Sequence, residues 1–155
     1  MSILKQIYEY KKEFVKTRKI SNSLEGVIKE SDKYKPKGFI SKIETDILNN
    51  NISIIGELKK ASPSAGIIFS DENDYHNIAN TYENNGISCL SILTDEKYFK
   101  GSDKDLEKIR SKVKLPIIRK DFIVDRYQLF ESKMLGADCI LIILSMLDKA
   151  EAIDL

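Results

Sequence analysis

The sequence has little histidine or cysteine. Its 155 residues include one histidine, His76, and two cysteines, Cys89 and Cys139. A single histidine leaves little material for a Ser-His-Asp triad or a zinc site. The cysteines stand in apolar, strand-like runs without the spacing of metal ligands, which favours small core residues over disulfide partners. The composition therefore offers no evident metal cluster.

The sequence also lacks an excess of charge of one sign and a long apolar run. Lys and Arg number 25 and Asp and Glu number 24, so the near-neutral chain gives no sign of a nucleic-acid or anionic-membrane partner. No apolar run approaches the roughly 18 residues that span a bilayer. The charged N-terminal segment lacks the apolar core of a signal peptide. We therefore expect a cytoplasmic, globular protein.

The first fifty residues predict helices. Residues 2–19 carry apolar side chains at helical spacing, which indicates an amphipathic helix. Two shorter helices are expected within residues 21–30 and 38–47, separated by a Lys-Pro-Lys-Gly break. We interpret residues 1–50 as an N-terminal helical extension.

From residue 51 onward the pattern changes to alternating strands and helices. Apolar runs recur at residues 52–58, 87–93, 115–119 and 139–144. Helix-like segments lie near residues 73–84, 102–112 and 126–135, and another begins near residue 147. Continuous apolar strands between helices indicate a parallel sheet covered by helices.

Two α/β architectures fit this alternation. One is a small doubly wound sheet, and the other is part of a (β/α)8 barrel, which typically needs about 250 residues. The chain stops within its fourth helix-like segment, which favours a fragment. We interpret residues 51–155 as the first half of a truncated barrel.

Charged residues stand where two of the predicted strands end. Glu57 and Lys59 are two residues apart and point to one face, and Lys120 ends the third strand. Arg119 and Asp121 point the other way. Because active sites of both architectures form at the carboxyl ends of the strands, Glu57, Lys59 and Lys120 could converge in one site. The alternative for each residue is the start of a solvated loop.

Four segments carry a resemblance to a known family. They are IIGELKKASPSAGII, CLSILTDEKYFKGS, LPIIRKDFIVDRYQ and LGADCILII, in this order along the chain. Together they resemble indole-3-glycerol phosphate synthase, a (β/α)8-barrel enzyme of tryptophan biosynthesis. The resemblance spans the whole chain and implies about the first four β/α units, preceded by N-terminal helices.

The resemblance assigns roles to seven residues. Glu57 and Lys59 match the catalytic and binding pair of the first strand, and Lys120 matches the general acid. The division of proton transfer between Lys59 and Lys120 stays open. Four residues match substrate-binding positions, Ser62 in the first loop and, around the aromatic ring of the substrate, Phe99, Phe122 and Leu141. Ordinary core packing is the alternative for the last three.

The resemblance also implies a reaction and its limits. The substrate is 1-(2-carboxyphenylamino)-1-deoxyribulose 5-phosphate, which undergoes decarboxylating ring closure without a metal or organic cofactor. The general base on the fifth strand and the phosphate site belong to later strands, so we expect the isolated chain to be inactive. Unpaired sheet edges favour self-association. The rival interpretations are another phosphate-binding barrel enzyme and a non-catalytic α/β fragment that associates through its sheet edges.

Overall fold

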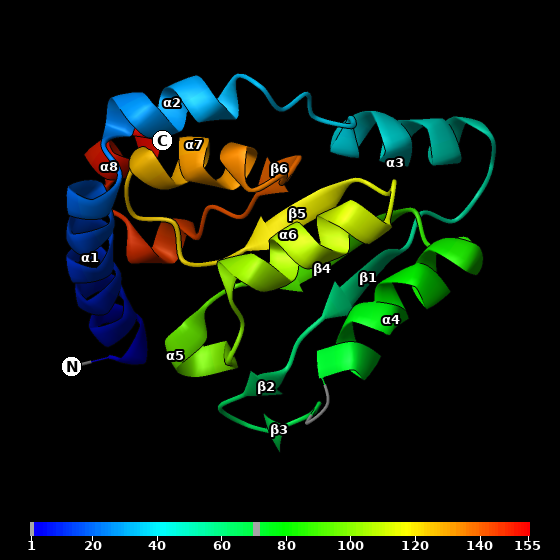
Figure 1. The fold of residues 1–155 in the computed structure, drawn as a ribbon, viewed down its shortest axis with the longest axis horizontal. Coiled ribbons are helices and arrows are strands. Elements are labelled where there is room, and N and C mark those ends of the chain that lie inside the picture. The colour runs from blue at the N-terminus through cyan, green and yellow to red at the C-terminus, as the bar shows by residue number, and fades with distance from the viewer. Residues whose placement is uncertain (1, 70–71) are drawn as a thin grey trace.

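Four parallel strands form the main sheet of the protein (Figure 1). The computed structural model describes residues 2–69 and 72–155. The strands lie in the order of the chain: β1 (Ile55–Leu58), β4 (Cys89–Leu93), β5 (Ile117–Lys120) and β6 (Cys139–Ile140). A doubly wound sheet carries its first strand in the interior, whereas β1 lies at an edge. The sequential order excludes that alternative and fits part of a (β/α)8 barrel.

Helices connect the strands and cover one face of the sheet (Figure 1). They are α4 (Glu72–Asn84), α6 (Asp103–Lys112) and α7 (Tyr127–Met134), and α8 (Lys149–Asp154) follows β6. Right-handed crossovers between parallel strands place each connecting helix on the same side. The alternation of strands and helices predicted from the apolar runs is confirmed.

Apolar side chains on one face of the strands hold the helices in place. Leu90 and Ile92 of β4 are buried in a cluster with Leu106 of α6. On β1, a Cβ atom at Gly56 would lie 2.6 Å from the ring of Tyr82. Glycine therefore permits the close approach of α4. Because side chains alternate along a strand, the residues between these face the opposite side of the sheet.

Three helices precede the sheet. They are α1 (Ile3–Ser21), α2 (Leu24–Ser31) and α3 (Phe39–Leu48). Helix α2 packs against α7, and α3 reaches the start of β4, where Cys89 Sγ lies 3.8 Å from the carbonyl oxygen of Phe39. Helix α1 lies near α5 (Glu96–Phe99), away from α3 (Figure 1). The division of the chain into residues 1–50 and 51–155 stays a prediction. In the described part of the chain, no helix combines the length and apolarity needed to cross a membrane.

The last strand is shorter than its apolar run predicts. The run covers residues 139–144, but β6 ends at Ile140. Two residue pairs join β6 to β5, and the ladder ends there. The chain then enters a short 3-10 helix, η1 (Leu144–Met146). Apolar character thus continues past the point where backbone pairing stops.

Two small elements follow β1 and β4 and were not predicted. The expected loop after β1 contains an antiparallel hairpin of β2 (Ala61–Ser62) and β3 (Gly66–Ile67). Helix α5 begins after Asp95, whose carboxylate accepts a hydrogen bond from the Tyr98 N–H at 2.6 Å. Elements of two to four residues are too short for hydrophobic periodicity to reveal.

Candidate active site

Three charged side chains meet at the carboxyl end of the sheet. Lys120 Nζ of β5 lies 2.5 Å from Glu57 Oε2 of β1. Lys59 Nζ lies 3.5 Å from the other carboxylate oxygen of Glu57. Ser91 of the intervening strand β4 is in register with Glu57, and its hydroxyl donates to Oε2 at 3.5 Å. The sheet therefore brings together the three charged residues that the sequence predicts at this end.

The two lysines keep Glu57 ionised. Burial alone would raise the pKa of Glu57, but the hydrogen bond and charge of Lys120 and the charge of Lys59 outweigh it. The pKa of Glu57 is therefore lowered from its ordinary value. The side chain of Lys120 remains 41 % exposed and that of Lys59 32 % exposed. Both lysine side chains therefore keep part of their surface accessible to solvent at the carboxyl end of the sheet.

An apolar pocket of about 210 Å³ lies beside Lys120. Its lining consists of Leu93, Phe99, Lys120, Asp121, Phe122, Leu141 and Ile143. The ring centroids of Phe99 and Phe122 are 6.1 Å apart. The three residues expected around an aromatic substrate thus gather next to Lys120, while Glu57 and Lys59 lie outside this lining.

Ser62 lies in the hairpin after β1. Its side chain is nearly buried, and its hydroxyl accepts a hydrogen bond from the Ala65 N–H at 3.0 Å. The hydroxyl of Ser64 lies 3.3 Å away. These contacts fix the turn of the hairpin, and the substrate-binding role of Ser62 stays a prediction.

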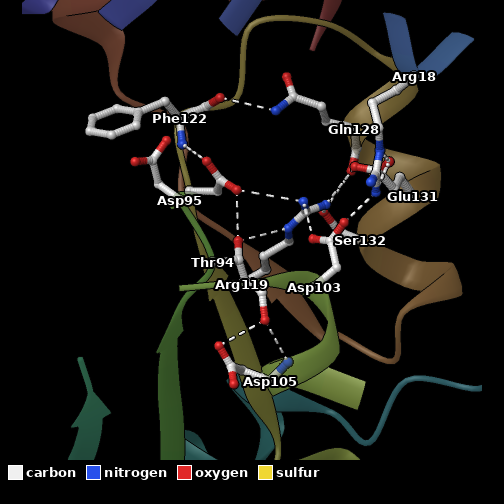
Figure 2. A network of polar contacts seen from close by, with 12 residues as sticks. Arg18, Thr94, Asp95, Asp103, Asp105, Arg119, Phe122, Gln128, Glu131 and Ser132 are labelled. Carbon is white, nitrogen blue, oxygen red and sulfur yellow. Dashed lines mark hydrogen bonds and ion pairs between the residues drawn. The ribbon is translucent and has the colours of Figure 1, made fainter. Parts of the chain in front are cut away.

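Arg119, the neighbour of Lys120, points into a buried polar network on the helix side (Figure 2). Its side chain is 1 % exposed. The guanidinium donates to four side chains at 2.7–3.2 Å, those of Thr94, Asp103, Glu131 and Ser132. Burial opposes the charge, but the surrounding carboxylates outweigh it and raise the pKa of Arg119. The network fixes the end of β5, which carries Lys120.

A second buried cation, Lys11 of α1, was not foreseen. Its side chain is 2 % exposed, and Nζ lies 2.6 Å from Asp121 Oδ1 and 2.9 Å from Asp95 Oδ2. A signal was present in the sequence, because Lys11 stands four residues from both Ile7 and Val15. These three residues are the buried ones of α1. A lysine at the centre of an apolar helix face needs a buried counter-charge.

The histidine and the cysteines lie outside this site. Among the side chains that the structure describes, no three or more of His, Cys, Asp or Glu are grouped to hold a metal ion. His76 is buried, with Nε2 3.1 Å from Asp105 Oδ1. Burial raises the pKa of the Cys89 thiol to about 11 and also raises that of Cys139. Because the thiolate is the reactive form of cysteine, burial disfavours that form at both positions.

The fold and the site together define a class of protein. Charged side chains and an apolar pocket lie at the carboxyl ends of consecutive parallel strands, and helices cover the outer face. This is the arrangement of the active site in (β/α)8-barrel enzymes. The chain is part of such a barrel.

Comparison with known proteins identifies the family. A family model described as indole-3-glycerol phosphate synthase matches residues 4–155. A relative of that name from Azospirillum brasilense is 42 % identical over 154 residues, covering 99 % of this chain and 58 % of its own length. Those from Clostridium kluyveri (43 % identical) and Legionella pneumophila (42 %) cover 94 % and 99 % of this chain and 55 % and 57 % of their own lengths. The chain belongs to the indole-3-glycerol phosphate synthase family, and it spans little more than half the length of these relatives.

Proposed function

We propose that this chain supplies the first half of an indole-3-glycerol phosphate synthase active site. The observation that carries the proposal is the Glu57–Lys120 pair, 2.5 Å between Oε2 and Nζ, beside an apolar pocket containing Phe99 and Phe122. The pair can deliver and stabilise charge, and the pocket suits an aromatic ring. Membership of the family adds the reaction, a decarboxylating ring closure by a carboxy-lyase.

The reaction forms one carbon–carbon bond and then releases carbon dioxide and water. The aromatic carbon that bears the carboxylate attacks the ketone carbon of 1-(2-carboxyphenylamino)-1-deoxyribulose 5-phosphate. The carbonyl oxygen takes a proton as the new bond forms. Loss of the carboxylate as carbon dioxide and then of water restores an aromatic ring, giving indole-3-glycerol phosphate.

Each site residue at the carboxyl end of the sheet has a proposed role in these steps. The Lys120 ammonium donates the proton to the ketone oxygen, since general acids of this kind must reach the reacting atom. Lys59 binds the substrate and is the alternative proton donor. Glu57 positions the ammonium groups of Lys120 and Lys59 at the carboxyl end of the sheet, because its oxygens lie 2.5 Å and 3.5 Å from their nitrogens. Phe99, Phe122 and Leu141 pack around the aromatic ring, and Ser62 contacts the substrate.

Residues beyond these 155 are needed for the rest of the proposed site. The resemblance assigns the general base to a fifth strand and the phosphate site to the last two loops. We therefore propose that residues 1–155 alone give no measurable ring closure. A chimera in which they replace the matching part of the Azospirillum brasilense relative is the corresponding complete barrel.

The test compares these two polypeptides by the fluorescence of indole-3-glycerol phosphate. We expect turnover from the chimera and none from residues 1–155 alone. The unaltered relative is the control for the assay. A chimera that folds, as judged by circular dichroism, yet shows no turnover would count against the proposed function. Substantial turnover by the isolated chain would overturn its proposed inactivity.

The edges of the sheet support a proposal about association. Strands β1 and β6 are the edge strands of the described sheet. Ile54 and Ile55 at one edge are about half exposed, and Leu144 beyond the other edge is 69 % exposed. Unpaired edges and apolar patches favour association, so we propose that residues 1–155 self-associate. A concentration-independent monomer in sedimentation velocity would contradict this.

The remaining expectations concern partners and location. We propose a phosphorylated small molecule as the substrate and no nucleic-acid partner, in keeping with a net charge of +1. The cytoplasmic location expected from the sequence stays a prediction, which cell fractionation would test.

A further inference from the structure

Helix α1 touches two loops that border the proposed site. One loop follows β4 and leads through α5 to Phe99, and the other follows β5 and contains Phe122. Lys11 reaches both loops by charge, through Asp95 in the first and Asp121 in the second. These three side chains are each 1–2 % exposed.

Each carboxylate that Lys11 binds also fixes the backbone of its own loop. Asp95 Oδ1 accepts from the Tyr98 N–H at 2.6 Å, while Oδ2 faces Lys11. Asp121 Oδ1 accepts from the Phe122 N–H at 2.7 Å as well as pairing with Lys11. The ammonium therefore sets the orientation of two carboxylates that determine where the following residues lie.

Asp95 depends on Lys11 more than Asp121 does. Asp121 Oδ2 accepts a hydrogen bond from Thr94 at 2.7 Å and lies 3.5 Å from Arg119. Asp95 Oδ2 is buried and, among the described residues, has no hydrogen-bond partner. This oxygen lies 2.9 Å from Lys11 Nζ, an ion pair by distance. Lys11 is thus the compensating charge for this oxygen.

Aromatic rings reinforce the same connection between α1 and the pocket. The Tyr98 ring meets those of Tyr10 and Phe122 edge-on, with centroids 6.2 Å and 6.3 Å apart. Phe122 in turn lies against Phe99, a pocket residue. Edge-to-face contacts at these distances are favourable and directional. A shift of either loop relative to α1 would therefore change the shape of the pocket.

Lys11 stays protonated, so its ion pairs with Asp95 and Asp121 persist. Burial works to lower the pKa of Lys11, but the charges of Asp121 and Asp95 outweigh burial and raise it. The ammonium therefore persists over the whole physiological pH range. A group that keeps its proton in this way holds other groups in place and does not transfer protons.

We propose that Lys11 is a positioning residue that joins the loops after β4 and β5 and so sets the spacing of Phe99, Lys120 and Phe122. This inference rests on the proposed function for the identity of the site. It adds a residue of the N-terminal helix, remote in sequence from the strand ends, to the groups that the reaction depends on.

The test separates positioning from simple charge balance. Lys11→Met leaves two buried carboxylates short of a cation, so it can destabilise the whole chain. The double variant Lys11→Met with Asp95→Asn removes one charge of each sign, and the new side-chain amide keeps an oxygen to accept from the Tyr98 N–H. Lys16→Met, on the same helix at a 68 % exposed position, is the matched control.

Amide hydrogen exchange measured by NMR on the 155-residue chain gives the readout without any need for turnover. In the double variant we expect the Tyr98 and Phe122 amides to exchange roughly tenfold faster or more. Amides of Leu90 and Ile92 in β4 should keep their wild-type rates, and Lys16→Met should change none of them.

Two results would overturn the proposal. Wild-type exchange of Tyr98 and Phe122 in the double variant would show that Lys11 only balances charge. Equal acceleration in both loops and in β4 would show a general loss of stability. Should neither variant fold, reductive methylation of the unaltered chain remains decisive: Lys16 is expected to react and Lys11 to be protected, and ready modification of Lys11 would refute the link. None of these measurements depends on ring closure, so a failure of the proposed function is recognised separately by the chimera.

Discussion

Arg119 and Lys120 are neighbours in β5 and carry the same charge, yet their surroundings are opposite. Arg119 is 1 % exposed and donates to five side chains in the buried polar network. Lys120 is 41 % exposed and pairs with Glu57 at the strand ends. A step of one residue reverses the face of a strand. The strand therefore separates a charge that serves the fold from one that stays exposed at the strand ends.

The two residue types suit these two positions. Removal of a charge from water costs several kcal/mol, so a buried ion persists only where its partners compensate fully. The planar arginine fork can satisfy several acceptors at once and keeps its charge. Lysine is a compact donor whose proton can be transferred. The partners of Arg119 come from α6, α7 and the end of β4, so the arginine also ties the helices to the sheet.

The largest expected effect is on stability and concerns Arg119, the buried residue of the two. Arg119→Met takes a buried cation away from Asp121 and Glu131, and we expect a loss of about 3–5 kcal/mol in the free energy of unfolding. Urea denaturation at a fixed protein concentration measures this. Arg126→Met is the control, because Arg126 is 59 % exposed and its loss should cost about 0.5 kcal/mol or less. Equal effects of the two substitutions would show that the network adds no stability.

The second effect is on turnover and concerns Lys120, the exposed residue of the two. In the chimera, Lys120→Ala should lower turnover by roughly 100-fold or more, the range expected for a lost general acid. The same change should alter the free energy of unfolding of the 155-residue chain by about 1 kcal/mol or less, since a partly exposed ion pair such as Lys120–Glu57 contributes little. Lys16→Ala is the control for both measurements. Near-normal turnover of Lys120→Ala, with a large loss for Lys59→Ala, would assign the acid role to Lys59.

The sequence predicted the surroundings of the exposed Lys120 better than those of the buried Arg119. The alternation of side chains along a strand and the order of the apolar runs were enough to predict that Glu57, Lys59 and Lys120 lie at one end of the sheet. The partners of Arg119 could not be found in this way, because they come from helices whose rotation depends on packing. Lys11 was overlooked for the same reason, although its place between Ile7 and Val15 was visible. Contacts between distant elements carry information that local periodicity lacks.

The hairpin after β1 and the early end of β6 show a second limit. Two-residue strands are defined by backbone pairing and leave no period in the sequence. The apolar run of residues 139–144 shows that apolar character and strand pairing are separate properties, because its last residues are apolar without being paired in β6. An apolar run in the sequence therefore does not by itself define where backbone pairing ends.

The smallest expected effect tests whether exposure sets the worth of an ion pair. Glu151 of α8, 24 % exposed, pairs with Lys12 at 2.9 Å and accepts a hydrogen bond from Tyr8, both on α1. The hydrogen bonds from Tyr8 and Lys12 lower the pKa of Glu151 from 4.5 to about 2. Since the folded pKa lies below the unfolded one, the ionised form stabilises the fold above about pH 4.5, and this contribution is lost as the pH falls toward 2.

Glu151→Gln removes the charge but keeps the capping box with Asp148, because glutamine can replace glutamate there. We expect a loss of about 1 kcal/mol or less at pH 7, far below that for Arg119→Met. Urea denaturation across the acid range should show the difference from wild type shrinking as the pH falls from about 5 toward 2. Glu13→Gln, at a 72 % exposed position, is the control. A difference that stays constant with pH would show that Glu151 acts through its shape, whereas a loss as large as that of Arg119→Met would show that burial is not what separates the two kinds of charge.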